Sequence, residues 1–62
     1  MIMEAYEKLL ELANAARDDM QKSADGNKAA GTRARKSMQE VREQAKVVRD
    51  AILQARGGSE GD

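Results

Sequence analysis

Cationic side chains are concentrated in one short stretch of this chain, residues 26–36. The stretch contains four cations and no carboxylate: Lys28, Arg33, Arg35 and Lys36. It begins within the turn signal Asp25-Gly26-Asn27 and therefore covers the start of a predicted helix. A helix start carries partial positive charge and unpaired N–H groups, so cations there cost stability, whereas a phosphate or another anion binds well. The pattern therefore predicts an anion site.

The charge distribution along the whole chain places the anion site in the same region. The 62 residues have a formal net charge of zero, with 11 cations against 11 carboxylates, but residues 20–39 hold five cations against Asp25 alone, a net of +4. Side chains of this region that suit phosphate contacts form the predicted site: Lys22, Asn27, Lys28, Thr32, Arg33, Arg35 and Lys36. Charge alone leaves open the alternative of a solvated loop end with excess charge.

The composition argues against catalysis and against a metal centre. Cysteine and histidine are absent, which removes thiol chemistry, disulfides and most transition-metal ligands. We therefore expect no enzyme activity, no cofactor, no metal and no small-molecule substrate. Glu4 follows the first apolar residues at once and no apolar run has the length of a membrane span, so neither a signal peptide nor a membrane segment is expected.

Two apolar heptad stripes predict two helices. Proline is absent, and good helix formers dominate the sequence. The stripes alternate steps of three and four residues: Ile2, Tyr6, Leu9, Ala13, Ala16 and Met20, then Ala34, Met38, Val41, Ala45, Val48, Ile52 and Ala55. Gly26 suits the position after the first helix and Asn27 the N-cap of the second. We expect helices over about 2–24 and 28–56, a turn at 25–27, a hairpin domain over 1–57 and a flexible tail over 58–62.

Folding the chain at the turn gives an antiparallel register in which the two stripes face each other. Acidic residues at heptad spacing then face basic residues at the same spacing, in the pairs Asp25–Lys28, Asp18–Arg35, Glu11–Arg42 and Glu4–Arg49. This arrangement leaves Lys22, Arg33 and Lys36 without an obvious partner in the chain. The predicted fold class is all-α, an antiparallel, coiled-coil-like two-helix hairpin.

A two-helix hairpin leaves one side of its seam open. Leu12 is expected on that side together with small and polar residues: Ala5, Ala30, Ser37, Gln44 and Ala51. We therefore predict a homodimer that forms a four-helix bundle. Gly31 lies inside the second helix at a cost of roughly 1 kcal/mol relative to Ala. Close backbone approach to a partner subunit or to a phosphate would explain it equally well.

The run from Gly26 to Arg33, continuing through Arg35-Lys36-Ser37-Met38-Gln39, resembles the chlamydial histone-like nucleoid proteins, a family named after the eukaryotic linker histone. Helical patterning extends the similarity more loosely over residues 2–56. The resemblance implies a small helical DNA-associated protein of the bacterial cytoplasm and nucleoid. The 62 residues do not include the long Lys/Ala-rich tail of that family, so strong DNA condensation is not expected.

These observations predict a protein that binds double-stranded DNA without sequence specificity. The basic hairpin tip would contact phosphates, and a dimer with two tips could bridge or compact DNA. Tyr6 is the single aromatic residue, so recognition of bases by stacking is not expected. The alternatives are a helical interaction module that docks an acidic protein partner and a purely structural coiled-coil segment.

Overall fold

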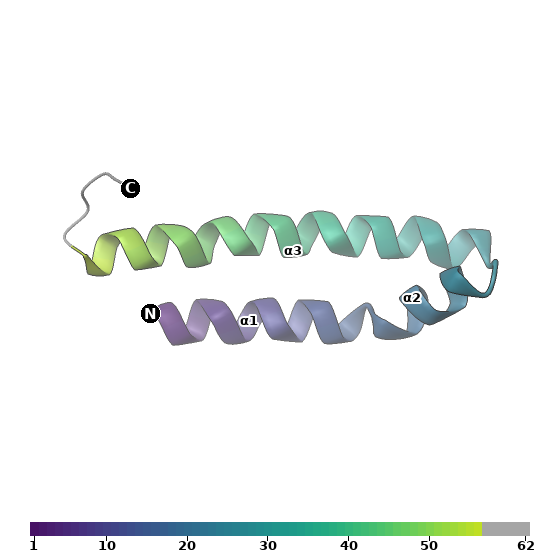
Figure 1. Ribbon diagram of the computed structural model, residues 1–62, viewed down its shortest axis with the longest axis horizontal. Helices are drawn as coiled ribbons and strands as arrows, with labels where there is room; N and C mark the ends of the chain where they lie inside the picture. The colour runs from purple at the N-terminus through teal and green to yellow at the C-terminus, as the bar shows by residue number, and fades with distance from the viewer. Residues whose placement is uncertain (57–62) are drawn as a thin grey trace.

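The computed structural model describes residues 1–56 as helices joined by short connections; the predicted tail at 58–62 lies outside the described residues. The elements are α1 (Ile2–Ala15), α2 (Arg17–Ala24) and α3 (Lys28–Ala55). In Figure 1, α1 and α2 follow one another along the length of α3, with the turn at one end and the N-terminus near the far end of α3. The described residues thus form the predicted antiparallel helical hairpin, with extents of 46 × 18 × 12 Å.

The turn between α2 and α3 forms as its residue types predict. Gly26 has a φ of +100°, which glycine adopts without steric cost. Its N–H donates to Ser23 O at 3.0 Å, and Asn27 N–H donates to Lys22 O at 2.9 Å, the pattern of a Schellman motif. Asn27 then caps α3, since its Oδ1 accepts a hydrogen bond from Ala30 N at 2.9 Å.

The first predicted helix is interrupted at Ala16, between α1 and α2. The Ala16 N–H donates to Ala13 O, three residues back, at 3.2 Å, and Met20 N–H donates to Ala16 O at 2.9 Å as the α-helical ladder resumes. This tighter turn bends the chain without a proline or glycine. Ala16 is only 1% exposed, so the bend occurs where the chain packs closely on the facing helix. Figure 1 shows α2 tilted relative to α1.

The contact seam is rotated relative to the predicted one. On each helix, one column of residues (a set at heptad spacing along one side of the helix) is replaced in the seam by the neighbouring column. Its buried or half-buried members are Ile2, Ala5, Leu9, Leu12, Ala16, Asp19 and Ser23, and on α3 Ala30, Ala34, Ser37, Val41, Gln44, Val48 and Ala51. The residues predicted for the open side therefore line the seam. The apolar stripe of each helix is three columns wide, and the hairpin buries only two of them.

The remaining apolar column is left exposed. Tyr6, Met20, Met38 and Ile52 were predicted to lie in the seam, yet each is between 38% and 44% exposed. Ala13 and Ala45, from the same column, are half-buried at the margin of the seam. One cross-helix hydrogen bond, from Gln44 Nε2 to Ala5 O at 2.9 Å, stabilises the observed register.

Small residues bring α2 and α3 together near the turn. Within residues 1–56 the fully buried apolar residues are three alanines, Ala16, Ala30 and Ala34, and no large side chain is completely buried. A Cβ added at Gly31 would lie 3.1 Å from Ser23 Oγ. Gly31 therefore permits a close approach to α2 of the same chain; approach of a partner subunit or of a phosphate to Gly31 stays a prediction.

Candidate nucleic-acid interface

The heptad row of cations on α3 and the acidic row on α1 and α2 lie on opposite sides of the hairpin. Because seven residues make nearly two helical turns, each row stays on one side of its helix. Arg35 and Arg42 line a groove together with the exposed Met20 and Met38. Glu4 instead lines a hollow with Ala5, Val47 and Ala51 on the other side of the seam. The two rows therefore cannot meet across the hairpin.

This separation makes the predicted ladder of ion pairs wrong. Among residues 1–56 the structure contains two ion pairs, and neither is a member of that ladder: Arg33–Asp19 and Lys46–Asp50. Arg35 and Arg42 are exposed and have no carboxylate partner within that part of the chain. The reason is the rotation of the seam by one column, which moves the two heptad rows away from each other.

Arg33, expected to be free, is paired. Its Nη2 lies 3.0 Å from Asp19 Oδ1, and its Nε donates to the same oxygen at 3.1 Å. Asp19 belongs to the half-buried seam, so this pair joins α2 to α3 close to the turn. Arg33 therefore neutralises a carboxylate of the hairpin and is less available for an anion than the other tip cations.

Two polar tip residues also have partners within the chain. The Asn27 oxygen is used by the N-cap of α3, which leaves its amide N–H groups as donors. Thr32 Oγ1 donates to Lys28 O at 3.4 Å, a long bond along the same helix. The hydroxyl oxygen of Thr32 keeps its capacity to accept, but its proton is directed back toward the helix backbone.

The remaining predicted cations are exposed at the tip and along the start of α3. Lys22, Lys28 and Lys36 have no ion pair among residues 1–56 and are exposed. Arg35, Lys36 and Thr32 line one shallow hollow together with Gln39. The structure thus brings three of the predicted residues together on the outer surface of α3 and commits Arg33 to Asp19.

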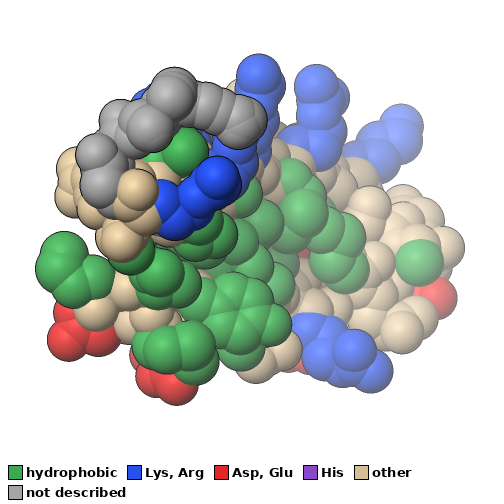
Figure 2. Space-filling view, turned by 60° about the vertical axis from the view of Figure 1, so that its left-hand side comes forward, with side chains coloured by type: hydrophobic (Ala, Val, Ile, Leu, Met, Phe, Trp, Pro, Cys, Tyr) green, Lys and Arg blue, Asp and Glu red, His purple; other side chains and the backbone are tan. Residues whose placement is uncertain are grey.

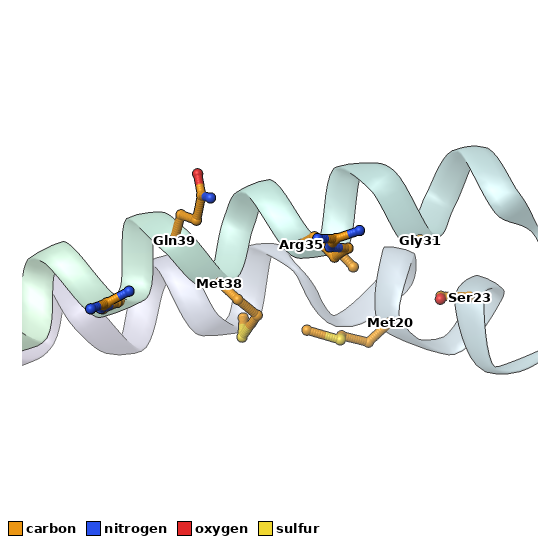
Figure 3. Close-up of a pocket in the computed structure, with 8 residues that line it drawn as sticks. Met20, Ser23, Gly31, Arg35, Met38 and Gln39 are labelled. Carbon is orange, nitrogen blue, oxygen red and sulfur yellow. The ribbon is translucent and has the colours of Figure 1, made fainter.

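Sequence reasoning left Arg42 out of the site because it was assigned to the ladder. The structure places it beside Arg35 on the rim of the apolar groove, which measures about 430 Å³. Figure 3 shows Met20 and Met38 on the same side of the hairpin, with Arg35 on α3 nearby. In Figure 2, hydrophobic side chains form a continuous patch on one face, with Lys and Arg side chains along its margin. The heptad spacing from Arg35 was the signal that could have included Arg42.

Comparison with known proteins bears directly on this basic helix. A family model described as histone H1-like protein Hc1 matches residues 3–58. The chain belongs to the Hc1 family. This confirms the resemblance expected from residues 26–39. No curated protein and no solved structure gave a significant match to the chain.

Membership of the Hc1 family implies a DNA-binding nucleoid protein and a role other than catalysis. Within residues 1–56, no group of three or more acidic side chains is arranged to hold a metal ion. A bilayer-spanning helix is likewise missing from that part of the chain, because none of the three helices is both long and apolar enough.

Proposed function

We propose that this Hc1-family chain binds double-stranded DNA through its phosphates, without base specificity, using the exposed cations of α3 and the tip. The observation that carries the proposal is the position of Arg35 and Arg42. Both are exposed on the side of the hairpin opposite the acidic row, and no carboxylate in residues 1–56 neutralises them. Lys28 extends the same basic surface toward the turn, Lys36 lies next to Arg35 on the outer surface of α3, and Lys22 lies on α2.

The spacing of the cations suits a phosphate backbone. Residues seven apart on a helix are separated by about 10.5 Å along its axis, since the rise is about 1.5 Å per residue. Phosphates follow one another every 3.4 Å of axis on each DNA strand, so Lys28, Arg35 and Arg42 match phosphates about three base pairs apart. Flexible cationic side chains on an exposed helix position a protein on DNA but carry no sequence information.

We further infer that the chain acts as a homodimer in the bacterial cytoplasm, at the nucleoid. A hairpin of this size, whose fully buried residues within positions 1–56 are three alanines, has little core of its own, and small domains of this kind gain stability from a second subunit. A dimer would present two basic surfaces and could bridge two duplexes or two parts of one. The four-helix bundle expected from the sequence stays a prediction.

A binding titration separates this function from its main alternative, docking of an acidic protein. The labelled ligands are a 20-base-pair duplex of mixed sequence, a second duplex of unrelated sequence and a poly-glutamate peptide of similar charge. We expect the two duplexes to bind equally, with an affinity that falls steeply as salt rises. Preference for the peptide over both duplexes would support the alternative, and a strong preference for one duplex would contradict binding through phosphates.

A further inference from the structure

Arg33 is held by α2 and is open to solvent at the same time. Its Nε donates to Asp19 Oδ1 at 3.1 Å, and its Nη2 lies 3.0 Å from the same oxygen. The other N–H groups of this guanidinium make no hydrogen bond within residues 1–56, and the side chain is 55% exposed. A phosphate presents several acceptor oxygens and pairs with a guanidinium in a bidentate manner. A phosphate of bound DNA can therefore compete with Asp19 for Arg33.

Asp19 has no second partner for its charge when Arg33 leaves. Its side chain is only 23% exposed and belongs to the seam between α2 and α3. Within residues 1–56, Arg33 is its one ion-pair and hydrogen-bond partner. Removing one member of such a pair leaves a poorly hydrated carboxylate against the facing helix, which is unfavourable. Loss of the pair therefore favours movement of Asp19 into water, away from α3.

Little else holds α2 on α3. No residue of α2 is buried, and the two half-buried positions within it are the polar residues Asp19 and Ser23. By contrast, α1 places Leu9 and Leu12 in the seam. Segments with few buried apolar contacts are the first to open locally, and a helix as short as α2 is only marginally stable by itself. Of the three helices, α2 is therefore the one that the Asp19–Arg33 pair can release.

Both ends of α2 can act as hinges. At Ala16 the α-helical ladder is interrupted, because Ala16 N–H donates to Ala13 O, three residues back. At the other end, Gly26 has a φ of +100° and the conformational freedom of glycine. Figure 1 shows α2 tilted away from the direction of α1. Changes in φ and ψ at a few such positions let a segment swing as a unit, so α2 can leave α3 while α1 stays packed.

We propose that α2 is a releasable segment: Asp19 occupies Arg33 in place of a phosphate, and DNA that takes over Arg33 undocks α2 from α3. This inference rests on the proposed function and adds Arg33 to its phosphate contacts. At moderate salt the docked state predominates, because the ion pair and the packing outweigh one screened phosphate contact. Phosphate contacts strengthen as salt falls, so the undocked state gains on DNA at low salt. Since coupling is reciprocal, whatever holds α2 on α3 weakens DNA binding.

A disulfide between α2 and α3 tests this inference directly. A Cβ built at Gly31 would lie 3.9 Å from Ser23 Cβ, within the range of about 3.5–4.5 Å found in disulfides. Figure 3 shows the two positions on adjoining helices. The chain has no cysteine of its own, so the variant Ser23→Cys/Gly31→Cys can form one specific bridge. Oxidation locks α2 in its docked position, and reduction releases it.

Fluorescence anisotropy with a short labelled duplex then compares the two redox forms at about 20 and 200 mM salt. The affinity of the reduced form relative to the oxidised form should rise by up to about eightfold as salt falls tenfold, because one more phosphate adds about 0.9 to the slope. The matched control carries the same cysteines with Asp19→Asn. Oxidation should leave its affinity unchanged, since Arg33 is then free in either form. Equal affinities of the two redox forms with Asp19 present, at both salt concentrations, would overturn the proposal.

Amide hydrogen exchange tests the docking of α2 without DNA. Asp19→Asn in the cysteine-free chain should speed exchange in α2 by roughly two- to fivefold, as for the loss of a partly exposed ion pair, while α1 keeps its protection. Unchanged protection of α2, or an equal loss in α1 and α2, would overturn the proposal. If neither redox form bound the duplex, the proposed function would fail, whereas faster exchange confined to α2 would still support its release.

Discussion

Replacing Arg35 and Arg42 by glutamine should reduce the salt dependence of DNA binding by about half. The expected slope counts the four exposed cations of α3 nearest the turn that have no ion pair among residues 1–56: Lys28, Arg35, Lys36 and Arg42. Four neutralised phosphates give a slope of log affinity against log salt near −3.6 per hairpin, because each contributes about −0.9. The affinity should then fall about 150-fold between 50 and 200 mM salt, and only about 12-fold for R35Q/R42Q, whose slope is near −1.8.

The assay is fluorescence anisotropy with a short labelled duplex, at protein concentrations where one hairpin binds one site. Lys46→Gln is the matched control, since Lys46 lies on the same helix but pairs with Asp50 at 2.9 Å. Its slope should stay close to that of the original chain. An unchanged slope for R35Q/R42Q, or an equal loss for Lys46→Gln, would refute the assignment of the arginine row to the interface.

Three further substitutions test individual contacts. Asp19→Asn releases Arg33 from its 3.0 Å ion pair, so the DNA salt slope should become steeper by about 0.9; an unchanged slope would mean that Arg33 only serves the fold. Asn27→Ala removes the cap on Ala30 N and should cost about 1 kcal/mol, lowering the thermal midpoint by about 4–8 °C at fixed protein concentration; no change would show that the cap is dispensable. Gly31→Ala should raise the free energy of unfolding by about 1 kcal/mol through helix propensity, but only in a Ser23→Ala background, which removes the Oγ that lies 3.1 Å from the added methyl. Thermal unfolding measures the gain with Ser23 and with Ala at this position. Equal gains in the two backgrounds would contradict that contact.

The helical hairpin could be predicted because its signals are local. Gly26 and Asn27 have residue types that suit a helix stop and a helix start, and both adopt the expected conformations. The heptad stripes indicate amphipathic helices in the same way. The bend at Ala16 has no such signal, since neither proline nor glycine is present there, and it depends on how closely Ala16 packs on α3.

The candidate site could be predicted only in part because it depends on how the helices rotate. Each apolar stripe is three columns wide, and the sequence does not say which two columns the hairpin buries. Choosing Tyr6 and Met20 in place of Ala5 and Leu12 shifts the seam by one column. That shift placed Arg42 in an ion pair it does not make and left Arg33 without the pair it does make with Asp19.

The most direct test of the central claim is an NMR titration of the uniformly labelled chain with a short duplex at low salt. We predict progressive amide shift changes around Lys28, Arg35, Lys36 and Arg42, with little change at Glu4 and Glu11 on the opposite side of the hairpin. No shift changes at a saturating duplex concentration, or changes confined to the acidic side, would contradict the claim that the exposed cations of α3 bind DNA phosphates.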